Sequence, residues 1–239
     1  YDIYFSELNT FLLIGSWRQS KTTSWNATLD FRKNPVLTSS NALQGQTVSS
    51  LDNLEEQFSE SEIQQIALDR TPNSQLINLG ITQRLGGKWT LYSNLTANKL
   101  SDIEASAGLE AIEGTDYELS GDIQLVGTGL LRDNDTGLFS IRYFDGDTTQ
   151  RTSARIDFRY PMTRNFRINP RFRIDQRTNT KDDTEQWIYR PSFKMTYRLQ
   201  RKYHFEFEMG GEWSTRELNA NNEETSSGVF GTLGYRVDF

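Results

Sequence analysis

Apolar and polar residues alternate with a period of two through the C-terminal part of the chain. The odd positions of 203–209 are aromatic or Met, and the even positions carry His or Glu. Segments 154–160, 166–175 and 187–199 alternate in the same way, as does the final segment, 228–239. Successive side chains of a β-strand point to opposite faces, so this period predicts strands with one apolar and one charged face.

The composition favours a sheet whose apolar face lies in lipid. Hydrophobic residues make up only 35% of the chain, yet 12% of the residues are aromatic, more than a disordered chain carries. A membrane-spanning β-barrel reconciles the two values, because only alternate residues face lipid. A soluble β-sandwich with one solvated face is the alternative, but consecutive strands with so many charges are uncommon there. We therefore predict an all-β fold, a transmembrane antiparallel up-and-down β-barrel.

The pattern predicts about twelve strands, an even number as in single-chain bacterial barrels. Short links and both termini would lie on the periplasmic side, and the long polar segments 98–115, 177–184 and 215–226 on the outer side. Aromatic residues at both ends of the strands would form two interfacial girdles. The expected strands are 1–6, 10–18, 23–32, 75–85, 88–97, 116–128, 136–145, 150–160, 165–176, 185–199, 202–214 and 227–239.

The final strand resembles the C-terminal signature of bacterial outer-membrane β-barrels. Tyr235, Val237 and Phe239 share its apolar face, and the last of them is the final residue of the sequence. The resemblance implies that these three residues form an insertion signal read by the barrel-insertion machinery. It also implies an outer-membrane location, in contact with lipid and lipopolysaccharide. Because export requires a signal, we expect further residues before Tyr1.

A second resemblance covers the chain from about Trp25 to Phe239. In the segments 30–38, 66–71 and 167–171, the chain is similar to barrels that follow periplasmic helical repeats of the tetratricopeptide kind. Some of those barrels export polysaccharide. This resemblance implies a periplasmic repeat domain or a lipoprotein as a partner.

Residues 33–74 interrupt the barrel pattern and predict a short helical insert within a single domain, 1–239. Leu51, Leu54 and Phe58 have helical spacing, and Ser59 with Glu62 forms a capping-box signature for a second helix. In that helix, Ile63, Ile66 and Ala67 would share one face. The acidic residues of the insert are Asp52, Glu55, Glu56, Glu60, Glu62 and Asp69.

The predicted lumen is basic. Its basic wall comprises Arg151, Arg155, Arg159, Arg167, Arg171, Arg173, Arg190, Lys194 and Arg198, and its acidic partners are Glu206, Glu208 and Glu212. One hypothesis is that the acidic insert docks on this wall as a plug or gate. The alternative is an exposed helical hairpin on the outer surface.

The predicted strand register places some of these charges opposite unlike charges and others opposite like charges. A turn at 200–202 would place Lys194 opposite Glu208 and Arg190 opposite Glu212, and such pairs could fill a narrow lumen. A turn at 161–165 would instead place Arg155 opposite Arg171. It would likewise set Arg159 opposite Arg167. Like charges in facing positions cost energy unless an anion neutralises them, so this second pattern hints at an anionic guest.

Catalytic chemistry has little basis in the sequence. There is no Cys and a single His, His204, so we predict no enzyme activity, no metal site and no cofactor. The formal net charge of −6 argues against nucleic acid as a partner. The predicted function is a gated or plugged channel for an anionic solute or polymer, which could be the membrane part of an export protein. The alternative is a closed barrel that anchors or assembles a periplasmic domain or lipoprotein.

Overall fold

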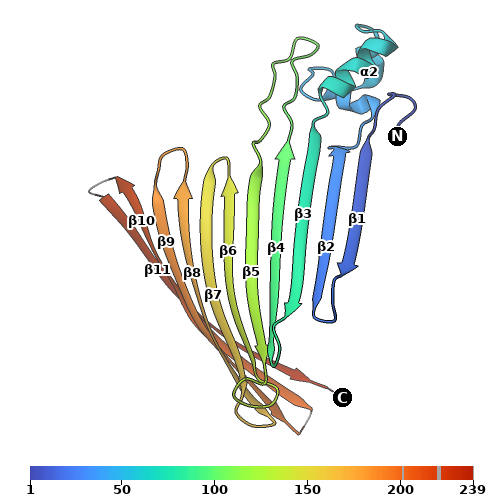
Figure 1. Cartoon of the computed structure of the whole chain (residues 1–239). Helices are drawn as coiled ribbons and strands as arrows, with labels where there is room; N and C mark the ends of the chain where they lie inside the picture. Colours follow the sequence, from blue (N-terminus) through green and yellow to red (C-terminus); the bar gives the residue numbers. More distant parts are fainter. Residues whose placement is uncertain (201, 220–221, 239) are drawn as a thin grey trace. The chain divides into compact units, whose positions relative to one another are not determined.

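The fold is an antiparallel up-and-down sheet. In the computed structural model, which describes residues 1–200, 202–219 and 222–238, eleven strands follow one another in sequence order (Figure 1). This confirms the predicted all-β antiparallel up-and-down fold. The strands are β1 (Thr10–Arg18), β2 (Thr23–Lys33), β3 (Asn73–Arg84), β4 (Trp89–Leu100), β5 (Glu118–Thr128), β6 (Thr136–Gly146), β7 (Thr149–Pro161), β8 (Phe166–Asn179), β9 (Glu185–Leu199), β10 (Tyr203–Asn219) and β11 (Asn222–Val237).

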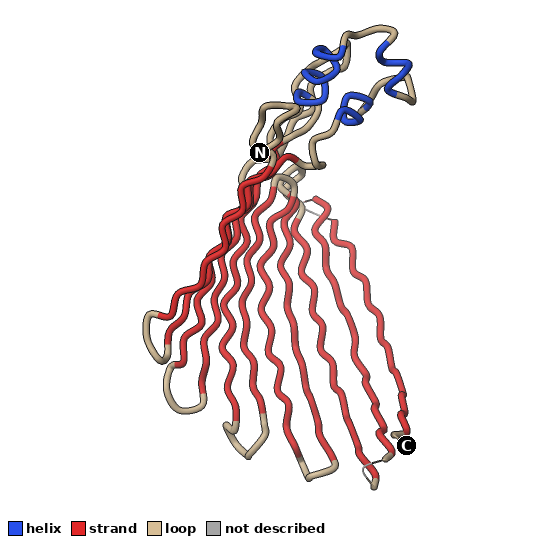
Figure 2. The backbone as a smooth tube through the Cα atoms, turned by 90° about the vertical axis from the view of Figure 1, so that its right-hand side faces the viewer, coloured by secondary structure: helices blue, strands red, loops and turns tan. Residues whose placement is uncertain are grey.

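The helices all lie between β2 and β3. They are η1 (Ser39–Leu43), α1 (Leu51–Glu55) and α2 (Glu60–Asp69), as Figure 2 shows in blue. Among the described residues, no helix combines the length and the apolar character needed to cross a membrane. The chain divides into two compact units. The first comprises 1–17, 26–79 and 96–119, and the second comprises 18–25, 80–95 and 120–239.

In the second unit, the register keeps the predicted apolar residues on one face. Ile156 lies opposite Phe139 on β6 and Phe172 on β8, and Tyr189 of β9 lies opposite Trp213 of β10. These side chains are exposed, from 39% for Tyr189 to 47% for Ile156. The strands therefore carry an apolar face that no other described part of the unit buries.

In the first unit, the helical insert forms a small core of its own. The core also takes Phe5 from the N-terminal segment, while Ala107 of the β4–β5 loop packs against it. The predicted helical spacing and capping box are confirmed, since Ser59 and Glu62 cap each other's backbone at the start of α2. The buried hydrophobic residues of the described chain are Phe5, Leu37, Ala42, Leu54, Ile63, Ile66 and Ala67.

The expected first strand, 1–6, is wrong. This segment forms turns closed by an isolated bridge between Asp2 and Glu7. The Asp2 carboxylate accepts hydrogen bonds from the backbone N–H groups of Tyr4 and Phe5 and from the Asn9 side chain, which favours a turn over an extended strand. The turn directs Phe5 into the core of the insert. An alternating pattern of only six residues does not distinguish a strand from a turn that places Phe5 in a separate core.

The expected long outer loop at 215–226 is also wrong. Here β10 and β11 continue to pair, with Thr215 opposite Thr225 and Arg216 opposite Glu224. The expected loop 177–184 is shortened too, because β8 extends to Asn179. A polar composition suggests a loop, but β-branched Thr and opposite charges across the strands also suit an exposed ladder. Long connections are therefore confined to the β2–β3 and β4–β5 links, so loop length orients fewer strands than expected.

Candidate functional site

The charged face of β7–β10 contains a buried carboxylate at its centre. Asp175 of β8 is fully buried and accepts a hydrogen bond from Ser153. Its Oδ1 lies 2.9 Å from Arg151 Nη2 and 2.9 Å from Arg173 Nη2, and its Oδ2 lies 2.7 Å from Arg190 Nη1. Three strands thus direct guanidinium groups at one aspartate, as the burial of a charge requires.

A second network lies further along the same face. Arg171 is 3.3 Å from both Asp157 Oδ2 and Glu208 Oε1, and therefore joins β7, β8 and β10. Asp157 also accepts from Arg155 Nη2 at 2.6 Å. These carboxylates neutralise Arg155 and Arg171. Glu208 is one of the acidic partners that the sequence predicts for the basic wall, whereas Asp157 is not.

The predicted acidic partners meet basic residues of the face. Arg190 Nε lies 2.5 Å from Glu212 Oε2, Arg171 reaches Glu208, and Lys194 forms an ion pair with Glu206. Tyr203 pairs with Leu199, so Lys194 is opposite Glu208 as predicted, although its ammonium reaches the diagonal Glu206. A diagonal contact suits the long Lys side chain, because Arg171 already holds Glu208.

The predicted register of β7 and β8 is wrong by two residues. Arg155 lies opposite Arg173, not Arg171, and Pro161 lies opposite Arg167. A turn at 162–165 whose Thr163 accepts hydrogen bonds from the backbone of 165 and 166 sets this register. A shift of two leaves every side chain on its face but changes its neighbours. The facing pair Arg155 and Arg173 therefore needs no anionic guest, since Asp157 and Asp175 bind them.

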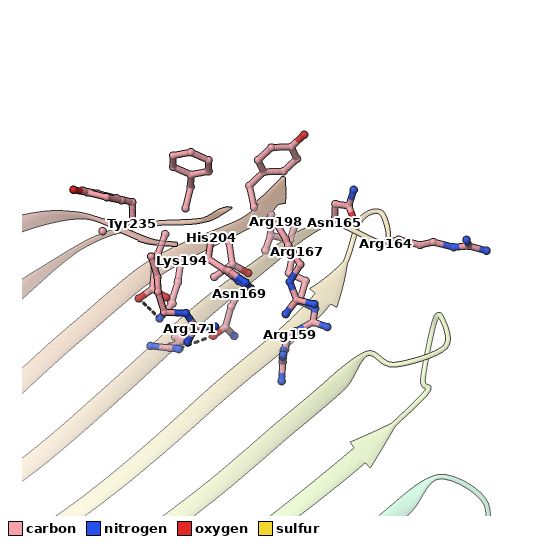
Figure 3. Close-up of a pocket in the computed structure, with 17 residues that line it drawn as sticks. Arg159, Arg164, Asn165, Arg167, Asn169, Arg171, Lys194, Arg198, His204 and Tyr235 are labelled. Carbon is pink, nitrogen blue, oxygen red and sulfur yellow. Dashed lines mark hydrogen bonds and ion pairs between the residues drawn. The ribbon is translucent and has the colours of Figure 1, made fainter. Parts of the chain in front are cut away.

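Three basic residues of the predicted wall have a different environment. Arg159, Arg167 and Arg198 line a cavity of about 580 Å³ that is formed by β7–β11 and the β7–β8 turn. Figure 3 shows these side chains on one side of the strands and Tyr235 on the other. All three side chains are positively charged, so they repel one another across the cavity. Sequence reasoning missed two further cationic lining residues, Arg164 of the turn and Arg236 of β11.

His204 borders the same cavity and lies 2.9 Å, through Nε2, from Asp238 Oδ2. Arg236 Nε lies 2.9 Å from the other oxygen of that carboxylate. Among residues 1–200, 202–219 and 222–238, no three His, Asp or Glu side chains cluster in a way that could hold a metal ion.

The turn between β5 and β6 is built around a buried aspartate. Burial by itself would raise the pKa of Asp135, but hydrogen bonds from three backbone N–H groups and the charge of Lys88 outweigh it and lower the pKa. The donors are the N–H groups of Leu130, Leu131 and Arg132, at 2.6, 2.7 and 2.8 Å. The carboxylate therefore stabilises the turn in its ionised form.

Half of the predicted acidic face of the insert is used locally. Glu60 accepts from the Tyr4 hydroxyl at 3.0 Å, Glu62 caps α2, and Asp69 accepts from Ser106 Oγ at 2.9 Å. The remaining three, Asp52, Glu55 and Glu56, are exposed. In the described part of the chain these three side chains form no ion pair.

The predicted insertion signal is only partly described. Tyr235 is 80% exposed on the apolar face of β11, and Val237 pairs with Tyr203 of β10. Phe239 lies outside the described residues.

Comparisons with known proteins leave the family open. The sequence matches no protein-family model, and no curated protein matches it significantly. Among solved structures, the chain is similar to the CymD monoaromatic hydrocarbon channel, with 12% sequence identity and a TM-score of 0.42. The match covers 96% of this chain and 72% of that chain. Values this low establish no function for this chain.

Proposed function

We propose that this chain forms the membrane-spanning β-barrel of a bacterial outer-membrane channel for an anionic solute or polymer. The observation that carries the proposal is the unburied apolar face of the strands. Ile141, Met209 and Leu233 are 60%, 52% and 82% exposed on three different strands. Apolar surface of this extent is unfavourable in water and is stabilised by lipid. Strands that close into a barrel satisfy all of their backbone groups within the sheet, as a bilayer requires.

The charge of the opposite face supports the anionic preference. Arg159, Arg167 and Arg198 have no carboxylate within ion-pair distance in the described part of the chain, and they line one cavity. Unneutralised arginines along a water-filled path attract anions and repel cations.

Gating by the insert is the second part of the proposal. The exposed carboxylates of Asp52, Glu55 and Glu56 are available for docking on arginines, whereas the other three acidic residues already serve the insert itself. Replacing these three by the matching amides tests the docking without disturbing the core that Leu54 helps to form.

Single-channel conductance in planar bilayers tests both parts. We expect small or rare currents from the intact chain. Anion-selective current should appear after deletion of 42–70 and after the triple amide replacement. Cation-selective current in the deletion variant would refute the anion channel, and an amide variant that behaves like the intact chain would refute docking through these carboxylates. Glu60→Gln, which changes an acidic residue bound locally by Tyr4, is the matched control.

A closed barrel that acts as an anchor or assembly platform is the second candidate. The ion-pair networks favour it, because Asp175, Asp157 and Glu208 bind five of the arginines on the polar face to one another across the strands. Silence from the intact chain and from both variants would favour this function. A periplasmic repeat domain or lipoprotein would then be sought by crosslinking and copurification. We propose no catalytic role, and assign His204 a structural one with Asp238.

A further inference from the structure

The arginines of the polar face fall into two groups. Arg151, Arg173 and Arg190 surround Asp175, and each lies within 2.9 Å of one of its oxygens. By contrast, none of Arg159, Arg167 and Arg198 has a carboxylate within 4.0 Å among residues 1–200, 202–219 and 222–238. The second group comes from β7, β8 and β9, so three consecutive strands direct unneutralised guanidinium groups toward one place (Figure 3).

The surroundings add positive charge to this group. Seven Arg or Lys residues line the cavity, and the single lining carboxylate, Glu206, is already bound to Lys194. Arg236 is bound to Asp238, and Arg171 to Asp157 and Glu208. The excess charge therefore resides on Arg159, Arg167 and Arg198 with Arg164 of the turn. The Arg, Lys, His and Glu residues of the lining are Arg159, Arg164, Arg167, Arg171, Lys194, Arg198, His204, Glu206 and Arg236.

We propose that this cavity, the arginine pocket, binds the phosphate group of a soluble phosphate ester. Guanidinium groups form paired hydrogen bonds with planar or tetrahedral oxyanions. Three guanidinium groups from three strands are satisfied better by the three terminal oxygens of a phosphate than by the two oxygens of a carboxylate. A cavity of about 580 Å³ leaves room for more than one phosphate group. The proposal rests on the proposed function, because it names the class of solute that the polar face would select.

The ligand is assigned to solution and not to the bilayer because the arginine side chains of the pocket lie on the polar face of the strands. In Figure 3, Arg159, Arg167 and Arg171 lie on the opposite side of the strands from Tyr235, which also lines the cavity but belongs to the exposed apolar face. A lipid headgroup would have to reach the charged face from the apolar one. A phosphate ester in water reaches it directly.

Calorimetric titration of the full chain with pyrophosphate tests the assignment. The protein is held in a non-ionic detergent that contains no phosphate. We expect Arg167→Gln and Arg198→Gln each to weaken binding by about tenfold, the effect of removing one charged hydrogen-bonding partner. The matched control is Arg142→Gln. Arg142 is an exposed arginine of the polar face on β6, opposite Ser153, and does not line the pocket. Its replacement should change the affinity less than about twofold.

A charge-conserving variant separates binding from folding. Arg167→Lys keeps the charge but loses the planar fork, so its affinity should fall between those of the wild type and Arg167→Gln. Equal weakening by Arg142→Gln and Arg167→Gln would reduce the pocket to general electrostatic attraction and overturn the proposal. Absence of pyrophosphate binding to the wild type would overturn it as well. Displacement of pyrophosphate by phosphatidylglycerol added to the micelles would transfer the site to a lipid headgroup and refute the soluble ligand.

The titration is independent of conduction, so the two proposals can fail separately. Pyrophosphate binding without any ion current would leave the pocket intact and remove the channel. Anion current that pyrophosphate does not block, in a protein that does not bind it, would leave the channel and remove the pocket.

Discussion

Neutralising Asp175 should destabilise the sheet more than any other single change of a carboxylate to an amide on the polar face. Asp175→Asn keeps the shape of the side chain but removes the charge that holds Arg151, Arg173 and Arg190 together. The variant leaves three guanidinium groups from adjacent strands facing one another around a neutral amide. Of the three, Arg190 keeps Glu212 as a carboxylate partner, whereas Arg151 and Arg173 lose the carboxylate that binds them.

The expected loss in the free energy of unfolding depends on how far Asp175 and its three arginine partners are buried. Breaking a fully buried ion pair costs about 3–5 kcal/mol. Asp175 has no exposed side-chain surface, but its three arginine partners retain 35–40% exposure, so water replaces part of what they lose. We therefore expect a loss of about 2–3 kcal/mol in the free energy of unfolding.

Urea unfolding from phospholipid vesicles, followed by Trp fluorescence, measures this loss. Glu212→Gln is the matched control, because Glu212 is 51% exposed and touches the same network only through Arg190. It should cost less than about 1 kcal/mol. A second replacement, Arg173→Gln in the Asp175→Asn background, should restore part of the stability by removing one of the like charges. Stability of Asp175→Asn within about 0.5 kcal/mol of the wild type, or equal to that of Glu212→Gln, would refute the reasoning.

Three further predictions concern a turn, a strand contact and a helix start. The pKa of Asp135 is lower in the folded state than in the unfolded state. The stability that Asp135 contributes is therefore fully present above the unfolded pKa and is lost as the pH falls through the folded pKa. Asp135→Asn should flatten this acid dependence in unfolding experiments between about pH 5 and 2. In Gly210→Ala the new Cβ would lie 2.7 Å from the Phe230 ring, which would have to move. The free energy of unfolding should therefore fall by about 1 kcal/mol in the same urea assay. An unchanged unfolding midpoint would contradict this contact. Ser59→Ala removes the side-chain acceptor for the Glu62 N–H and should lower the local stability of α2 by about 1 kcal/mol. Amide exchange should become faster in α2 and stay unchanged in β8. Exchange in α2 as slow as in the wild type would speak against the cap.

The alternation in the sequence is sufficient to predict most strands and their two faces. Segments such as 185–199 fold as the strand that their period of two requires, and Tyr189, Tyr197 and Leu199 are exposed on its apolar face. The insert is equally predictable, because helical spacing and a capping box are local signals that depend on residues three or four apart. The prediction for residues 1–6 fails because their role is to supply Phe5 to a core built from 37–67. That contact is not local in sequence.

The partners of the charged residues depend on the tertiary structure. A period of two fixes which face a side chain occupies, but a shift of two residues between strands preserves that face and exchanges every partner. The turn at 162–165 makes this choice, placing Arg155 opposite Arg173. Burial then selects Asp175 as the carboxylate that three arginines share and leaves Arg159, Arg167 and Arg198 without one in the described part of the chain. The sequence by itself therefore determined a sheet with one apolar and one basic face. Only the register and the burial of particular side chains decided which of its charges are neutralised within the protein and which are available to a ligand.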